Sequence, residues 1–478
     1  MGIYYVSPTG DDGEDGLTEA TAWETVGKVN GETFSAADEI LFEGGGTWDE
    51  ALIVPAADLS FGVYVSSTVG IDARATIDVS GGAANCIDCA FDGCSFTRID
   101  LTGATGDGFF ADDANGLTLS FMDSTSNGGD GFKLNGDDIT ITSLVSTGNT
   151  GQGYSQAGTY STLVADGCSA TDNVGDGWKL TGSTAFSLVN CTGSSNGNGS
   201  GSSRGVAFIG CDSGTSTRIL AEDNDGHGIQ VTTNGGTHST GIVIDYPVCR
   251  GNGVGGSTGS GISVDQTSGN IDITKPTLSG NDEAGVVCRT ASTDITVAWG
   301  VIHDNPIGFW LTGDHGVNCR LWNSLVMNSS TAGAAITEST TATSGSIKNN
   351  IFRDNEIGVR LDAEGISVVH AINFNLYYNN TTFAVSYDED TYTDASIDAF
   401  NADHATYESN GIGGADPLQA SPPEDVHLQP GSLAIATGTT EDAGPDYYGS
   451  TPKSTPSIGP SEWVGAPFWT PAYGRGRR

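Results

Sequence analysis

The chain has 478 residues, of which 70 are glycine, and its 18 Lys and Arg against 59 Asp and Glu give a formal net charge of -41. A surface of this charge repels nucleic acid and anionic membranes, and it suits surroundings in which salt or divalent cations screen the repulsion. No apolar run approaches the roughly 20 residues that a spanning helix needs, so we expect neither nucleic-acid binding nor membrane insertion.

Residues 1–50 differ from the rest of the chain and predict an N-terminal cap. Residues 3–6 have a strand-like pattern, an acidic loop follows, and residues 21–30 are consistent with one short helix. The N-terminus has no basic segment followed by an apolar one, so no secretory signal is visible. We therefore expect assembly inside a cell, or else a chain that has been trimmed.

Beyond residue 105 a glycine returns roughly every 22 to 25 residues, often as Gly-x-Gly, and a period in this range is typical of a solenoid. The last glycines of the repeats are Gly108, Gly131, Gly153, Gly177, Gly205, Gly228, Gly261, Gly285, Gly308, Gly333 and Gly358. Apolar residues follow one and three positions later, as in Phe132 and Leu134, with a polar residue such as Lys133 between them. This alternation predicts a strand with one buried face.

A second strand follows in many repeats, as at residues 139–141, and a turn rich in Asn and Gly then closes the coil. The turn asparagines are Asn127, Asn149, Asn173, Asn224, Asn281, Asn305 and Asn355. We interpret them as turn formers, because Gly and Asn tolerate the positive φ of sharp corners. The pattern predicts an all-β fold, a parallel β-helix with one coil per repeat and like residues stacked about 4.8 Å apart.

Four segments are predicted. They are the cap at 1–50, the parallel β-helix at 51–385, the last irregular coils and C-terminal cap at 386–463, and an aromatic and basic tail at 464–478. The first coils, up to about residue 105, are expected to be irregular.

Both ends of the chain resemble a known superfamily. The segments Tyr4–Gly10, Ala22–Val26 and Asp38–Gly45 resemble the entry cap of right-handed parallel β-helix proteins, and the segments 415–418, 426–435, 446–449 and 458–462 resemble their last coils. This superfamily includes pectate-lyase-like polysaccharide lyases and phage tailspike or fibre proteins. The resemblance implies a right-handed parallel β-helix, a fold that hosts lyases, hydrolases, epimerases and pure binders.

The nine cysteines are an odd number, and several occupy apolar positions of the coils. No His or further Cys stands at a zinc-site spacing from Cys86 and Cys89, so we expect small buried thiols rather than a metal site. Free thiols indicate a reducing place of synthesis.

Three aspartates, Asp107, Asp130 and Asp176, occupy one column beside the repeat glycine. Neighbours in this column are expected about 5 Å apart over one coil and about 10 Å over two, which brackets the carboxylate spacing of glycosidases. The same oxygens could hold Ca²⁺, the one cofactor considered, although none is required. The alternative is that Asp is only a turn former repeated with the coil.

Lys133 and Lys179 point outward in the near-identical strings Gly-Asp-Gly-Phe-Lys-Leu and Gly-Asp-Gly-Trp-Lys-Leu. In the β-helix lyases that the chain resembles, a Lys or Arg abstracts the proton next to a uronate carboxylate. The alternative is an ion pair on a solvated face. The Asp triplet with Arg-x-Pro-x-x-Arg of pectate lyases is absent, which argues against pectate lyase activity.

A second candidate face, for substrate binding, lies in the later coils, because sugar rings stack on exposed aromatics and Arg recognises carboxylates. Its residues are Trp310 and Arg360 in one column, with Trp322, Arg320, His303 and Arg353 in the same coils. The alternative is that the tryptophans cover core at subunit contacts.

The tail changes character, since it is aromatic and basic on an acidic protein and two prolines prevent it from forming a coil. Its candidate docking residues are Phe468, Trp469, Tyr473, Arg475, Arg477 and Arg478. It is predicted either to pack on a neighbouring subunit or virion protein, or to fray as chain ends do.

Three functions remain open. The first is a homotrimeric phage virion appendage, tailspike- or fibre-like and assembled in the host cytoplasm, which binds and in one version cleaves a host surface glycan. The second is a polysaccharide lyase acting on an acidic glycan, which would favour secretion. The third is a non-catalytic structural or adhesion solenoid.

Overall fold

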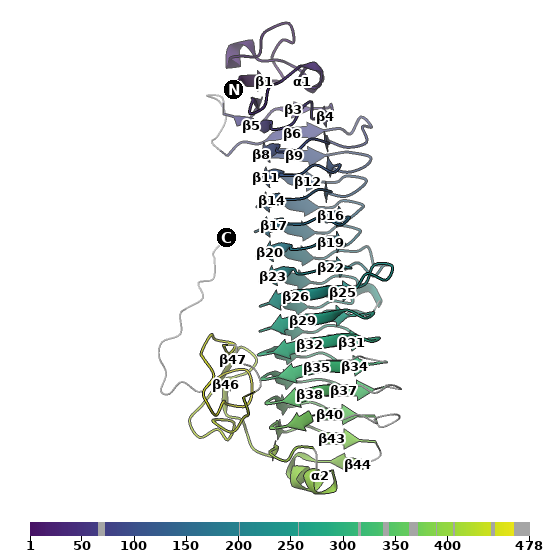
Figure 1. The fold of residues 1–478 in the computed structure, drawn as a ribbon, viewed down its shortest axis with the longest axis vertical. Coiled ribbons are helices and arrows are strands. Elements are labelled where there is room, and N and C mark those ends of the chain that lie inside the picture. Colours follow the sequence, from purple (N-terminus) through teal and green to yellow (C-terminus); the bar gives the residue numbers. More distant parts are fainter. Residues whose placement is uncertain are drawn as a thin grey trace.

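The structure, a computed structural model, describes residues 1–65, 72–199, 201–256, 258–313, 317–337, 344–362, 371–388, 390–404, 407–440 and 445–462. It is an elongated solenoid in which each coil adds one strand to each of three parallel sheets (Figure 1). Each sheet has 15 strands, of which only β44 at the end of the third sheet pairs antiparallel, and we name the sheets A, B and C in the order in which a coil visits them.

Sheet A contains β1 (Ile3–Val6), β2 (Glu39–Glu43), β5 (Ser60–Tyr64), β8 (Ser95–Thr97), β11 (Thr118–Ser120), β14 (Ile139–Thr142), β17 (Leu163–Asp166), β20 (Ser187–Val189), β23 (Thr215–Thr217), β26 (Thr240–Asp245), β29 (Gly269–Thr274), β32 (Thr293–Ala298), β35 (Val317–Trp322), β38 (Ser344–Lys348) and β41 (Ala371–Asn373). Sheet B contains β3 (Thr47–Trp48), β6 (Ala75–Asp78), β9 (Ile99–Thr102), β12 (Asp123–Thr125), β15 (Val145–Thr147), β18 (Ser169–Thr171), β21 (Thr192–Ser194), β24 (Leu220–Glu222), β27 (Val248–Arg250), β30 (Thr277–Ser279), β33 (Val301–His303), β36 (Leu325–Met327), β39 (Ile351–Arg353), β42 (Leu376–Tyr378) and β45 (Ile412–Gly413).

Sheet C contains β4 (Leu52–Ile53), β7 (Ile87–Cys89), β10 (Phe109–Ala111), β13 (Phe132–Leu134), β16 (Tyr154–Ala157), β19 (Trp178–Thr181), β22 (Val206–Ile209), β25 (Ile229–Thr232), β28 (Ile262–Val264), β31 (Ala284–Arg289), β34 (Ile307–Thr312), β37 (Ala332–Thr337), β40 (Ile357–Leu361), β43 (Phe383–Tyr387) and β44 (Asp390–Tyr392). Outside the three sheets lie β46 (Gln419–Ser421), β47 (Asp425–Leu428), the helices α1 (Val26–Gly31) and α2 (Ile397–Asp403), and the short 3₁₀ turns Glu19–Thr21, Val254–Gly256 and Asp394–Ser396.

The repeat predicted from the glycines is confirmed and forms sheet C. Phe132 pairs in register with Phe109 and with Tyr154, and Tyr154 pairs with Trp178. These side chains lie in the core, and the ring centroids of Tyr154 and Trp178 are 4.0 Å apart. The second glycine of each Gly-x-Gly is needed for close packing, because a Cβ on Gly131 would meet the Ser146 hydroxyl and a neighbouring carbonyl. The column therefore fixes the register of successive coils.

Each coil has three strands where the sequence predicted two. The missed strands form sheet B, and examples are β12 and β15 just before the turn asparagines. The inward residues of β12 and β15 are small, Ser124 and Ser146, so these strands lack the apolar alternation that identified sheets A and C, whereas later strands of sheet B bury larger residues such as Leu278 and Phe352. Parallel pairing with the strands above and below holds them in place.

The turn asparagines were interpreted wrongly as positive-φ residues. The positive φ falls one residue earlier, for example at Ser126 and Asp172, and the asparagine side chains are buried. The Asn127 side-chain amide donates to Asn149 Oδ1 at 3.0 Å, and Asn149 donates in the same way to Asn173. The chain of amides continues through Asn196, Asn224, Asn252, Asn281 and Asn305. We call it the inner ladder.

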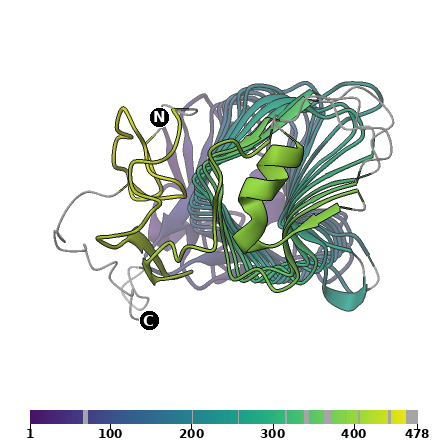
Figure 2. The ribbon, with the colours of Figure 1, turned by 90° about the horizontal axis from the view of Figure 1, so that it is seen from below.

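Both ends of the coil stack are closed. At the N-terminus α1 buries Val26 and Val29 in the core, and Trp23 stacks on Tyr4 with ring centroids 5.1 Å apart. At the other end α2 lies across the last coils, as the end-on view shows (Figure 2), and its Ile397 and Phe400 join the core. The described residues contain no helix long and apolar enough to cross a membrane.

The residues after β45 turn back and pack beside the solenoid on the outward face of sheet B. There an apolar column that includes Val301, Leu325 and Ile351 is covered by Val426 and Ile458. This side of the last coils is therefore occupied by the chain itself. All nine cysteines are buried, as expected for small core side chains.

Candidate functional site

The predicted Asp column lies at the edge of sheet C, and its members hold successive coils together. The backbone N–H of Asp130 donates to Asp107 Oδ1 at 2.7 Å, and the N–H of Gln152 donates to Asp130 Oδ1 at the same distance. The N–H of Arg204 donates to Asp176 Oδ1 at 2.8 Å. We call this column the outer ladder, and it occupies one oxygen of each carboxylate.

The second carboxylate oxygens have separate partners. Asp107 Oδ2 lies 3.9 Å from Lys133 Nζ, Asp130 Oδ2 accepts from Ser155, and Asp176 Oδ2 lies 3.2 Å from the Arg204 guanidinium. Burial raises the pKa of Asp107, and the neighbouring Asp130 charge acts in the same direction. In the described part of the chain no group of three His, Cys, Asp or Glu side chains is arranged to hold a metal ion.

The two predicted lysines lie two coils apart on the outward face of sheet C, with Ser155 between them. Lys133 packs over the Phe110 ring at 5.0 Å. Lys179 is half-buried and forms no hydrogen bond or ion pair within the described ranges. Of the two, Lys179 is therefore the cation that remains available for a ligand.

The six residues of the second predicted face lie on three different sheets. Trp310 and Arg360 share one column of sheet C, with Ala335 between them, as predicted. The remaining members are Arg320 and Trp322 on sheet A, and His303 and Arg353 on sheet B. The Arg320 guanidinium stacks on the Trp322 ring of the same strand at 5.0 Å. The structure therefore does not bring the six predicted residues together.

The predicted tail residues Phe468, Trp469, Tyr473, Arg475, Arg477 and Arg478 lie outside the described residues.

Sequence reasoning missed a group of polar residues on the outward face of sheet C, over β25, β28 and β31. We call it the sheet C cluster, and it consists of His227, Gln230, Ser260, Ser263, Asp265, Glu283 and Arg289. Register places the column Ala207, Gln230, Ser263, Val287 and Trp310 along this face. Ala207, Ser263 and Val287 are fully buried although they point away from the core, so larger side chains cover them.

Arg289 connects the two carboxylates of the sheet C cluster. Its guanidinium forms an ion pair with Glu283 and lies 3.7 Å from Asp265 Oδ1. Glu283 Oε2 accepts from the Ser260 hydroxyl at 2.8 Å. Asp265 Oδ2 accepts from Gln230 at 2.7 Å and from Ser263 at 2.9 Å. A charged group this far from water needs such partners, so the network fixes where both carboxylates point.

His227 continues the outer ladder with a ring nitrogen in place of a carboxylate. Its Nδ1 accepts the backbone N–H of Ser260 at 2.9 Å, so the neutral ring carries its proton on Nε2. Burial lowers the pKa of His227, and the positive charge of Arg289 adds to this while Asp265 opposes it. At neutral pH His227 is thus an uncharged hydrogen-bond donor beside two carboxylates.

Three buried polar atoms at this face have no hydrogen-bond partner. They are Asp265 Oδ1, Gln230 Oε1 and Arg204 Nε. An unpaired buried polar group costs about 1–3 kcal/mol, and such groups gather where a ligand supplies the partner. The sheet C cluster therefore has two unused acceptors, and Arg204 has an unused donor.

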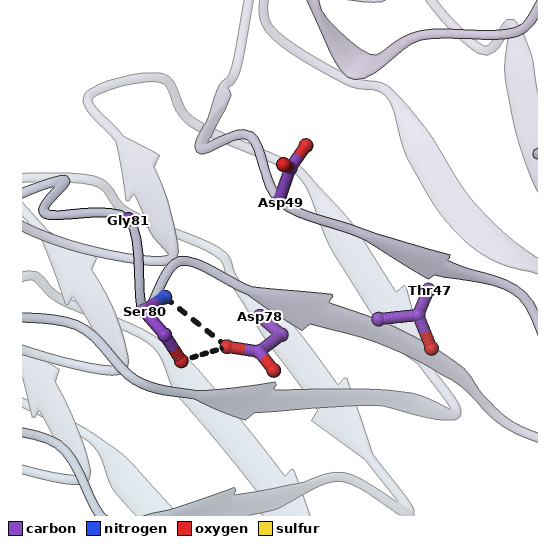
Figure 3. A pocket seen from close by; sticks show the side chains of 5 residues that line it. All are labelled: Thr47, Asp49, Asp78, Ser80 and Gly81. Carbon is purple, nitrogen blue, oxygen red and sulfur yellow. Dashed lines mark hydrogen bonds between the residues drawn. The ribbon is translucent and has the colours of Figure 1, made fainter.

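A hollow of about 570 Å³ lies elsewhere, on the first coils, between Thr47 of β3 and Asp78 of β6 (Figure 3). Asp78 Oδ1 accepts from the backbone and the hydroxyl of Ser80, while Asp49 lies across the hollow. Asp78 thus stabilises the turn at Ser80. The described residues that line this hollow do not form a hydrogen-bond network like that of the sheet C cluster.

One signal in the sequence could have found the sheet C cluster. Four residues after the repeat glycine stand Asp265 in one coil and Arg289 in the next, so opposite charges fall side by side at the strand ends. Glu283 stands two residues before its glycine, a position that the repeat does not mark.

Comparisons with known proteins bear on the fold. Residues 80–244 match the family model described as a right handed beta helix region. No curated protein sequence matches the chain. Among solved structures, the chain is similar to the A-module of the mannuronan C-5 epimerase AlgE4 of Azotobacter vinelandii, with 14% identity, 75% of this chain and 91% of that chain covered, and a TM-score of 0.42.

Two further similar structures span nearly the whole chain. One is the pectate lyase Pel9A, with 16% identity, 97% of this chain and 96% of that chain covered, and a TM-score of 0.40. The other is XylC in complex with xylose, with 8% identity, 96% and 98% covered, and a TM-score of 0.43.

Proposed function

We propose that the chain, whose residues 80–244 match a right-handed β-helix family model and whose strands stack into three sheets, binds a polysaccharide along the outward face of sheet C and cleaves it at the sheet C cluster. The observation that carries the proposal is the network in which Arg289 connects Asp265 and Glu283 beside the neutral His227. The virion location predicted from the sequence stays a prediction, and the proposal does not depend on it.

The shape of the face suits a linear polymer. Sheet C runs the length of the solenoid, and its outward column or adjoining edge carries Lys133, Lys179, Arg204, Arg289 and Arg360, five of the 18 basic residues of the chain. Sugar hydroxyls both donate and accept hydrogen bonds, which matches the unpaired Asp265, Gln230 and Arg204 atoms. Trp310 lies three coils beyond Gln230 and is half-buried, and its aromatic ring is of the kind on which sugars stack.

The chemistry proposed is acid–base cleavage of a glycosidic bond. Glu283 or Asp265 removes a proton, either from water or from the carbon next to a uronate carboxylate, while His227 Nε2–H donates a hydrogen bond to the leaving oxygen, which takes its proton from water. Lys179 and Arg204 neutralise charge on the bound chain. Positioned acid and base groups each contribute about 10²–10⁴-fold in rate, so the loss of either is measurable.

The test is a panel of charged and neutral polysaccharides incubated with the full-length protein, followed by reducing ends and by absorbance at 232 nm. Elimination raises both signals, whereas hydrolysis raises only the reducing ends. We expect Glu283→Gln to lower the rate on the responsive glycan at least about 100-fold with unchanged affinity. A glycan that is cleaved equally by the parent and by Glu283→Gln would assign the base to Asp265, and equal cleavage by Asp265→Asn as well would remove the sheet C cluster from the mechanism.

The chain offers a matched control. Arg74 connects Asp100 at 2.9 Å and Asp123 at 2.6 Å on sheet B, and its side chain is 30% exposed against 27% for Arg289. Arg74→Lys and Arg289→Lys make the same chemical change in the same kind of triad. Only Arg289→Lys is expected to weaken cleavage, and equal losses in the two variants would mean that stability rather than the site was affected.

A further inference from the structure

A hollow of about 350 Å³ lies at the turn from sheet C to sheet A, beyond the end of β25, the strand that carries Gln230 of the sheet C cluster. It extends over the turns that follow β16, β19, β22 and β25. Its floor includes Gly182 and Gly210, which have φ of +73° and +63° and no side chain to fill the space. One wall is the loop after β25, a small hairpin in which Asn234 pairs with Thr237. The hollow is thus built by a longer loop beside shorter, glycine-containing turns.

The hollow is connected to the sheet C cluster through β25 and β28. Gln230 of the cluster lies on β25, and the strand runs directly into the wall at Asn234. Across the coils, Thr233 donates to the Gln266 side chain at 3.0 Å, next to Asp265. Asn234 is four residues beyond Gln230, which in an extended chain is about 13 Å. A group that projects sideways from a polymer on sheet C therefore reaches the hollow.

The lining of the hollow recognises hydroxyl groups rather than charge. Within the described ranges the side chains of Asn234 and Thr181 have no hydrogen-bond partner, and Asp212 adds a carboxylate that accepts only from Ser213. His238 pairs with Thr267. Asn, Thr and Asp together present acceptors and donors to vicinal hydroxyls, while Asp212 and the net charge of -41 disfavour an anionic unit.

We propose that this hollow binds a neutral sugar unit that branches from the polysaccharide held on sheet C. The inference rests on the proposed function and names its substrate class, a branched glycan with neutral side sugars. The volume is at the small end of ligand pockets, which suits a single sugar unit.

The experiment separates this inference from the proposed function. Saturation-transfer NMR on the full-length protein uses methyl glycosides of neutral hexoses and methyl glucuronide as probes. The parent is expected to bind at least one neutral glycoside and to bind the glucuronide at least tenfold more weakly. Thr184→Trp, which places a ring in the hollow, is expected to lower that neutral affinity at least tenfold.

Two controls keep the test falsifiable. Thr140→Trp makes the same change at an exposed position of sheet A and should bind the neutral glycoside like the parent. Glu283→Gln, which would abolish cleavage, should also bind it like the parent. The proposal that the hollow binds a neutral sugar would be overturned by any of three results: no neutral glycoside signal in the parent, equal binding of the glucuronide, or full binding by Thr184→Trp. None of these results bears on the cleavage proposal, which has its own test.

Discussion

Two ladders run along the same turn between sheets B and C, and they differ in composition. The inner ladder is asparagine at every step from Asn127 to Asn305. The outer ladder changes from Asp107 and Asp130 through Gln152 to His227. An inner step must both accept from the previous coil and donate to the next, and it is buried, so only an uncharged amide serves. An outer step must only accept one N–H, so any acceptor fits.

This difference explains where chemistry arises on the solenoid. In the outer ladder the fold uses only one acceptor atom of each side chain. The other polar atoms of that side chain remain free to bind a ligand or a neighbouring residue. His227 shows the consequence, since its Nδ1 is occupied by the Ser260 N–H and its Nε2 is left as a donor. The inner ladder has no such spare atoms, because both amide groups of each Asn are used.

The largest effect is expected from breaking the inner ladder. Asn224 accepts from the backbone and the side chain of Asn196, and it donates to Gly193 and Asn252. Asn224→Leu keeps the branched shape but leaves several buried polar groups unpaired, and it should lower the free energy of unfolding by about 3–5 kcal/mol. Urea unfolding measures this. A loss below about 1 kcal/mol would mean that water replaces the amide and that the inner ladder is not closed to solvent.

The next effect concerns the end of a related ladder. Asn350 donates to Asn375, and Asn375 donates to Glu408, whose carboxylate also accepts from the Tyr377 hydroxyl at 2.6 Å. Burial raises the pKa of Glu408 to about 7, from 4.5. Because the folded pKa is above the unfolded one, this group contributes stability that is complete below pH 4.5 and is lost as the pH rises through 7.

The expected size of that loss is on the order of 3 kcal/mol between pH 4.5 and 7.5. Glu408→Gln cannot titrate, so the difference in unfolding free energy between the parent and Glu408→Gln should change by this amount over the same range. Urea unfolding at a series of pH values gives the curve. A difference that stays constant with pH would show that Glu408 has an ordinary pKa and meets water.

A smaller effect is expected in the outer ladder. Asp130→Ala removes the acceptor of the Gln152 N–H, but this edge of the sheet meets solvent and water can replace it, so the cost should be about 1 kcal/mol. Asp130→Asn keeps a side-chain oxygen and should lie within about 0.5 kcal/mol of the parent. If Asp130→Ala cost as much as Asn224→Leu, the contrast between the two ladders would fail.

The same contrast explains what the sequence could predict. The positions of Phe132, Tyr154 and Trp178 followed from an apolar period that depends only on burial. The strands β12 and β15 of sheet B were not predicted because their inward residues, Ser124 and Ser146, are polar and resemble the residues of a turn. The sheet C cluster was not predicted because Asp265 follows β28, whereas Glu283 and Arg289 stand at the two ends of β31 in the next coil. Comparing one sequence repeat with the next does not reveal contacts between residues at positions that the repeat does not mark.

The smallest effect concerns cations, for which the sequence left Ca²⁺ open. The outer ladder spreads its carboxylates one per coil, and within the described residues no three acidic, His or Cys side chains are grouped for a metal ion. A charge of -41 is therefore expected to respond to screening rather than to a site. We expect millimolar CaCl₂ and NaCl of equal ionic strength to raise the melting temperature alike, by a few degrees over an EDTA-treated sample at low salt. A clearly larger rise with calcium than with matched sodium, absent from Asp130→Asn, would show instead that the outer ladder binds the ion through Asp130 and would restore the cation site that the sequence allowed.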